Sequence, residues 1–297
     1  DRVASRGLGD VYKRQAPTDY DRYAAARIMA EEQRHGWQMA YLLMTYFGQQ
    51  GRREAQKLLE RNAQDGDRLL GAFNRPMPHW LDFFCYTMFV DRDGKFQLGM
   101  LSTSAFKPLA ASMGPMLKEE SFHLGTGSNG LRRIIKAGVI PLDMLQRYIN
   151  KWVATAHDLF GVDASSSAHW AYVWGIKGRW DERKKLEAGN QVDKEILNEE
   201  ARGHYHDEIA GEVAKLSKYL PEGVTKLYVP HENFNRDIGV AKRQKFTVEG
   251  TAFEGSDEEW NDYITSHLPT KEDEEALKEI FEQEWLSLIH ISEPTRR

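Results

Sequence analysis

Two segments of the chain repeat the same short pattern of ionisable side chains. Glu32 and His35 lie in the run EEQRH, and Glu120 and His123 lie in the run EESFH. Residues at positions i and i+3 share one face of a helix, so each pair can reach a common ligand. The pattern therefore predicts either a cation site or two ordinary ion pairs at the solvent edge.

The residues around these pairs favour the cation site. Each pair lies in an apolar stripe at helical spacing: Ile28, Met39, Leu42 and Tyr46 around Glu32 and His35, and Met113, Met116 and Leu117 around Glu120 and His123. Burying a carboxylate costs several kcal/mol unless it is paired or binds a metal. Two Glu-x-x-His helices that face one core, with one carboxylate from each of two further helices, are typical of bundles that bind two iron or manganese ions.

Asp91 is the candidate ligand from a third helix, because it lies 29 residues before Glu120. The same step back from Glu32 reaches position 3, so we expect the ligand from the first helix to be absent. An exposed aspartate in a hairpin turn is the alternative for Asp91. Glu31 and Glu119 lie four residues before the same histidines, and we interpret them as hydrogen-bond partners of the ligands.

Helical periodicity dominates the chain, and we predict an all-α bundle over residues 16–160 followed by an irregular, partly helical extension over residues 161–285. The predicted helices are Asp19–Phe47, Arg52–Leu70, Phe106–Leu124, Leu131–Ala137, Leu142–Leu159 and about Gln191–Leu220, with a looser segment at Tyr228–Gly255. The glycines of HLGTGSNG are expected to end the helix that begins at Phe106. Leu81–Leu101 stays open between a helix and a β-hairpin around DRDG.

The composition excludes several classes of protein. The chain has 297 residues, of which 41% are hydrophobic and 29% are charged, and its formal net charge is −5, which is unfavourable for nucleic-acid binding. A single cysteine, Cys85, excludes a disulfide framework and is interpreted as a buried small hydrophobic residue. No apolar run is long enough to cross a membrane, and we expect a cytoplasmic protein.

The two ends of the chain read as translated sequencing adapters. Ser5–Gln15 and Leu286–Arg296 can be encoded by the two complementary strands of one DNA sequence. Residues 1–15 and 286–297 are therefore interpreted as adapter-derived and not native, and the remainder as a fragment of a longer gene product.

Residues 90–94 (VDRDG) and 117–123 (LKEESFH), together with the upstream Glu32-x-x-His35, resemble the benzoyl-CoA 2,3-epoxidase family of oxygenase components. This family belongs to the ferritin-like class of bacterial multicomponent di-iron oxygenases. The resemblance implies a ferritin-like bundle in which Glu32, His35, Asp91, Glu120 and His123 bind iron. It also implies that Leu81–Leu101 is helical.

The activity implied by this resemblance is epoxidation of the ring of benzoyl-CoA in aerobic aromatic degradation. It uses two iron ions, O2 as co-substrate and electrons that a separate reductase takes from NADPH. The fragment itself is expected to be inactive without the first helix. The alternatives are an oxygenase subunit of the phenylacetyl-CoA type and a non-catalytic ferritin-like iron-binding protein.

A basic, glycine-rich segment follows the second Glu-x-x-His pair. Residues 125–130 (GTGSNG) precede Arg132, Arg133 and Lys136, and they could form an anion site for the CoA phosphates at a helix start. An ordinary helix–loop–helix connection with a solvated basic face is the interpretation that we favour. His204 and His206 lie two residues apart on a predicted helix and point in different directions, so both are predicted to be surface residues.

Overall fold

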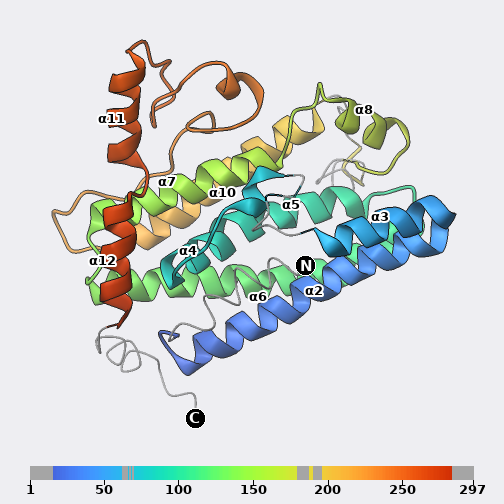
Figure 1. Ribbon diagram of the computed structural model, residues 1–297, viewed down its shortest axis with the longest axis horizontal. Helices are drawn as coiled ribbons and strands as arrows, with labels where there is room; N and C mark the ends of the chain where they lie inside the picture. Colours follow the sequence, from blue (N-terminus) through green and yellow to red (C-terminus); the bar gives the residue numbers. More distant parts are fainter. Residues whose placement is uncertain are drawn as a thin grey trace.

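The computed structural model describes residues 16–61, 66, 68, 70–178, 187–189 and 196–282. Both segments that read as adapter sequence lie outside these ranges. The described residues form an all-α, ferritin-like bundle, and within them the only β-type pairing is an isolated antiparallel bridge between Phe246 and Ala252. The longest helices run along the molecule, whereas α11 and α12 stand across one end of it (Figure 1).

The first described helix, α2, spans Asp19–Tyr46 and confirms the predicted amphipathic helix. The Thr18 hydroxyl accepts a hydrogen bond from the Asp21 backbone N–H at 3.0 Å and so caps the helix N-terminus. Helix α3, Gly48–Glu60, packs back against α2. Both ends of α3 lie earlier in the chain than those of the predicted helix, Arg52–Leu70. Within that predicted range, residues 62–65, 67 and 69 lie outside the described residues.

Residues Trp80–Ser102 form one continuous helical segment, so the hairpin alternative is wrong. It consists of α4 (Trp80–Cys85), the π-helical η3 (Tyr86–Val90) and α5 (Asp91–Ser102). The DRDG run lies inside α5 and forms no turn there. A π-helical stretch within an α-helix is rare, and it often occurs at functional sites. Here it ends directly before Asp91.

Helix α6 runs without interruption from Lys107 to Ala137, and Gly138 ends it with a φ of 64°. The prediction that the glycines of HLGTGSNG stop the helix is therefore wrong. A Cβ at Gly130 would lie 2.2 Å from the Phe84 ring, and one at Gly127 would lie 2.5 Å from the Met88 backbone nitrogen. These two glycines let α6 approach the helix beside it, which is a tertiary requirement that the local sequence pattern does not reveal.

Helix α7, Leu142–Leu159, has the predicted bounds, and α10 spans Leu197–Ser217 within the predicted charged helix. Residues 190–195 lie outside the described part. Buried residues of α4 to α7 and of α10 belong to one hydrophobic cluster, which includes Trp80, Phe84, Trp152 and Tyr205. Cys85 is fully buried in this cluster, as predicted.

The remaining helices are short: α8 (Ser166–Val173), α11 (Asp257–His267) and α12 (Lys271–Glu282), with 3-10 turns at Gly71–Asn74 and Gly239–Lys242. Trp170 and Trp174 on and after α8 are 54% and 71% exposed, so they do not belong to the core. No helix among the described residues is long and apolar enough to cross a membrane.

Candidate metal centre

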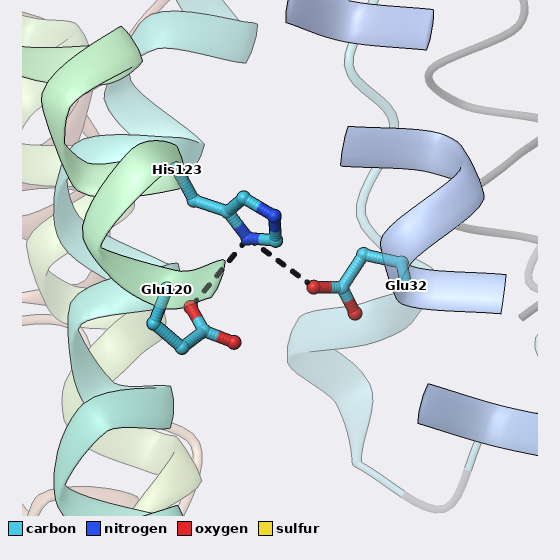
Figure 2. Close-up of side chains that lie close together, drawn as sticks. All are labelled: Glu32, Glu120 and His123. Atoms are coloured by element: carbon cyan, nitrogen blue, oxygen red, sulfur yellow. Dashed lines mark ion pairs between the residues drawn. The ribbon is translucent and has the colours of Figure 1, made fainter. Parts of the chain in front are cut away.

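The five predicted ligands come together in the middle of the bundle. Glu32 and His35 lie on α2, Asp91 is the first residue of α5, and Glu120 and His123 lie near the middle of α6. Figure 2 shows Glu32 reaching from α2 toward His123, with Glu120 on the same side of the imidazole. One ligand atom each from Glu32, Glu120 and His123 lies within 4.8 Å of the others.

Three carboxylates surround one nitrogen of His123. The His123 Nδ1 atom is 3.4 Å from Glu32 Oε1, 3.6 Å from Asp91 Oδ2 and 3.6 Å from Glu120 Oε2. The side chain of His123 is fully buried, and Asp91 and Glu120 are 8% and 6% exposed. Asp91 is thus a buried helical residue and not an exposed turn aspartate. On α2, the Nδ1 atom of His35 has one inner carboxylate beside it, Glu32 Oε1 at 3.6 Å.

The outer nitrogen of each histidine contacts a glutamate on the opposite helix. His35 Nε2 lies 2.7 Å from Glu119 Oε2, and His123 Nε2 lies 3.0 Å from Glu31 Oε2. An ionised carboxylate can only accept a hydrogen bond, so each Nε2 donates to its glutamate. Each Nδ1 faces the inner side of the cluster, and its lone pair becomes available to a metal once the ring is neutral, which is how histidine ligands are oriented in metal sites.

Two arginines of α2 hold the outer glutamates in turn. Arg27 donates to Glu31 Oε1 at 2.9 Å, and Arg34 lies 2.5 Å from Glu119 Oε1. The arginines explain why Glu31 and Glu119 point outward while Glu32 and Glu120 point inward. Sequence reasoning missed both arginines, although Arg27 lies four residues before Glu31, a spacing at which side chains pair on a helix.

The donor set fits a cation, as three buried atoms show. Asp91 Oδ2, Glu120 Oε2 and His123 Nδ1 are buried and have no hydrogen-bond partner. A buried polar atom without a partner costs about 1–3 kcal/mol, and more if it is charged. The three atoms point into one space, where a single cation can satisfy all of them. Mixed oxygen and imidazole donors suit iron and related divalent metals.

Protonation compensates for the closeness of the carboxylates. Burial raises the pKa of Asp91 well above its usual value, and Glu120 and Glu32 raise it further. Burial likewise raises the pKa of Glu32. Burial alone would lower the pKa of His123, but the carboxylates of Glu120, Asp91 and Glu32 outweigh it and raise this pKa to about 10. A bound cation would displace these protons, because ligands must be deprotonated to bind metal.

A cavity of about 300 Å³ opens beside the cluster. Glu32, His35 and Glu120 line its polar side. Its apolar walls come from α2, α3, α5 and α6: Met39, Leu58, Leu98, Leu101, Met113 and Met116. An apolar space with a few convergent polar groups is the usual form of a small-molecule site.

The basic residues after the second Glu-x-x-His pair do not form an anion loop. Residues 125–130 are helical, so no helix begins there, and both the anion site and the helix–loop–helix connection are wrong. Arg133 is buried and pairs with Asp21, its Nη1 lying 2.9 Å from Asp21 Oδ2. Arg132 and Lys136 lie over the Tyr219 ring, 6.0 and 4.9 Å from its centroid.

The two histidines of α10 differ from each other. His204 is exposed, as predicted. His206 is partly buried, and its ring stacks on that of His157, with 3.3 Å between His206 Nδ1 and His157 Nε2. The prediction that His206 is a surface residue is therefore wrong. Neither histidine of α10 joins the five-residue cluster.

Comparison with known proteins identifies the family of this chain. Residues 12–232 match the family model described as "Phenylacetic acid catabolic protein". Benzoyl-CoA oxygenase component B of Aromatoleum evansii is 35% identical to the chain over 302 aligned residues. The alignment covers 87% of the chain and 63% of that relative, so the chain spans less than two thirds of the relative's length. Because this family model matches more than half of the chain, the chain belongs to the phenylacetic acid catabolic protein family.

Proposed function

We propose that this chain carries the metal-binding bundle of a di-iron oxygenase that epoxidises the aromatic ring of benzoyl-CoA. The observation that carries the proposal is the convergence of three unpartnered buried donors, Asp91 Oδ2, Glu120 Oε2 and His123 Nδ1. The relative named benzoyl-CoA oxygenase component B supports the choice of substrate. Its name, as one component of an oxygenase, also supports the presence of partner components. The proposal includes among them a separate reductase that uses NADPH.

In this proposal Glu32, His35, Asp91, Glu120 and His123 hold two iron ions. Bound iron would supply the activation of O2. Glu31 and Glu119 accept hydrogen bonds from the two imidazoles and so fix which nitrogen faces the metal.

The cavity beside the cluster takes the acyl group of the substrate. Its methionine and leucine walls would hold the benzoyl ring next to Glu120 and exclude water. Overall, one oxygen atom of O2 enters the ring, and the other leaves as water after taking up two electrons and two protons.

The test uses the full-length gene product, loaded with iron, chemically reduced, and mixed with O2 and benzoyl-CoA. Mass spectrometry of the thioester is expected to show the gain of one oxygen atom. His123→Ala removes a ligand and should abolish both iron binding and this gain. His204→Ala is the matched control, since His204 is an exposed histidine outside the cluster. A His123→Ala protein that still oxygenates benzoyl-CoA would refute the proposal.

The name of the matched family favours a second candidate, a CoA ester of phenylacetic acid. The same assay with phenylacetyl-CoA separates the two substrates. Oxygenation of phenylacetyl-CoA in preference to benzoyl-CoA would keep the metal site and replace the substrate. Iron binding without oxygenation of either ester would favour a ferritin-like iron-binding protein.

A further inference from the structure

A pair of polar side chains joins the cavity beside the candidate metal centre to a second cavity. Gln97 on α5 lines the first cavity together with Glu32 and Glu120. Its Oε1 atom accepts a hydrogen bond from Lys177 Nζ at 2.9 Å. Its Nε2 group donates to Asp93 Oδ1 at 3.2 Å and to the Leu159 carbonyl at 3.3 Å, and both bonds hold the amide in this orientation.

Lys177 lines the second cavity, which has a volume of about 290 Å³. Asp163, His169 and Asn198 also line this cavity. Lys177 Nζ donates to Asn198 Oδ1 at 2.7 Å in addition to its bond with Gln97. The ammonium group of Lys177 therefore lies in the second cavity and donates directly to Gln97, which lines the first.

Backbone contacts hold Lys177 in this place. The Gly178 N–H donates to the Met100 carbonyl at 3.1 Å, and the Ala105 N–H donates to the Gly175 carbonyl at 2.7 Å. Both bonds attach the segment around Lys177 to the end of α5, the helix that carries Gln97. These backbone hydrogen bonds thus keep Lys177 close to Gln97.

The surroundings of Lys177 make its ammonium group a ready proton donor. Among the described residues no carboxylate lies within ion-pair distance of Nζ, and its two hydrogen-bond partners are neutral amide oxygens. Burial lowers the pKa of Lys177, and the more distant Asp93 and Asp163 oppose this shift. The other titratable groups that line its cavity are Asp163, His169 and Tyr172. A lysine in such a place releases a proton more easily than one in water.

We propose that Lys177 delivers protons from the second cavity to the candidate metal centre past Gln97. The inference rests on the proposed function, in which each oxygenation consumes O2, two electrons and two protons and releases one water. An N–H bond of Lys177 breaks, and its proton passes to a water molecule beside Gln97 in the first cavity. That water in turn gives a proton to the oxygen atom that leaves as water. The neutral amine then takes a proton from solvent in the second cavity.

The test compares Lys177→Arg and Lys177→Met in the iron-loaded, full-length protein. Arginine keeps the positive charge and can donate hydrogen bonds, but it does not release a proton at physiological pH. Both variants are expected to oxygenate the CoA ester at least tenfold more slowly, in line with the usual size of general acid catalysis. Methylamine should partly restore Lys177→Met. Lys95→Met is the control, because Lys95 is partly exposed and pairs with Glu208.

A second measurement needs neither iron nor turnover. The metal-free wild-type protein is acetylated with a water-soluble amine reagent over a range of pH, and peptide masses give the reactivity of each lysine. Lys177 is expected to react through the second cavity, with its half-maximal rate at a lower pH than that of Lys95. A half-maximal pH equal to or above that of Lys95 would overturn the inference.

The outcomes separate the two proposals. If the wild-type protein oxygenates benzoyl-CoA and Lys177→Arg does so at the same rate, the inference about Lys177 is wrong and the proposed function stands. A slow Lys177→Met beside a normal Lys177→Arg assigns Lys177 a role in charge or packing, which also overturns the inference. If the wild-type protein binds iron but oxygenates neither CoA ester, the proposed function fails, whatever the variants do.

Discussion

Gly130→Ala tests the close packing that fixes the position of α6, and with it Glu120 and His123. The new Cβ would lie 2.2, 2.4 and 2.5 Å from three atoms of the Phe84 ring. That ring is 1% exposed and contacts Trp80 and Phe83, with centroid separations of 5.7 and 5.6 Å. The ring therefore has little room to move away.

The magnitude follows from two opposing effects. Forcing a methyl group into a packed core costs about 1–3 kcal/mol, and more where the neighbours cannot shift. Replacing glycine by alanine within a helix contributes about 1 kcal/mol in the opposite direction. Because the Phe84 ring is confined, we take the upper part of the first range, about 2–3 kcal/mol, and expect Gly130→Ala to lower the free energy of unfolding by about 1–2 kcal/mol net. Gly127→Ala should cost more, since its Cβ would meet the Met88 backbone.

Urea denaturation followed by circular dichroism measures this change, and the same helix supplies the control. A Cβ at Gly125 would meet no atom within 4 Å, so Gly125→Ala should gain the helix propensity alone and raise stability by up to about 1 kcal/mol. Phe84→Leu in the Gly130→Ala background should recover part of the loss that Gly130→Ala causes. Equal stabilisation by Gly125→Ala and Gly130→Ala would refute the packing argument.

Two further predictions concern charged groups. Glu119→Gln weakens the partner of His35 Nε2, and we expect a 10- to 100-fold lower affinity in a cobalt(II) titration. An unchanged affinity would contradict the orienting role of Glu119. The second prediction concerns His157, whose pKa is lowered well below 6.5 by burial and then by nearby His206 and Arg236. Below pH ~6.5 the unfolded chain therefore binds a proton at His157 that the folded chain does not. The free energy of unfolding should then decrease by about 1.4 kcal/mol for each unit by which the pH is lowered. His157→Gln should flatten this slope in urea titrations at pH 5–7, and an unaltered slope would show that other groups cause it.

The Glu-x-x-His pairs were predictable from sequence because ionisable residues in an apolar helical stripe need a compensating partner. The histidine-to-glutamate contacts between α2 and α6 were not predictable, since their partners lie 84 and 92 residues apart. The docking of the two helices pairs each histidine with a glutamate of the other helix, and it leaves Glu32 and Glu120 facing the candidate metal centre. Arg27 and Arg34 pair with Glu31 and Glu119 and so hold these two glutamates on the outer side of the cluster.

Local turn signals left the prediction open at one place and made it wrong at another, for the same physical reason. DRDG and GTGSNG favour turns in isolation, yet both runs lie inside helices. In the first, the helical segment is buried against the bundle, and Arg92 within it donates to Glu208 of α10 at 2.5 Å. In the second, Gly127 and Gly130 serve close approach and not chain reversal. Tertiary packing outweighs turn propensity where the whole segment is buried.

The exchange of partners between α2 and α6 has a consequence for the order of assembly. Neither helix alone can orient its own histidine, because His35 depends on Glu119 and His123 depends on Glu31. During synthesis, His35 is made long before Glu119, so a nascent chain holds only half of each pair. On the proposed function, tight iron binding therefore requires that both helices have docked. A chain that has synthesised only α2 would lack the oriented histidines that such binding needs.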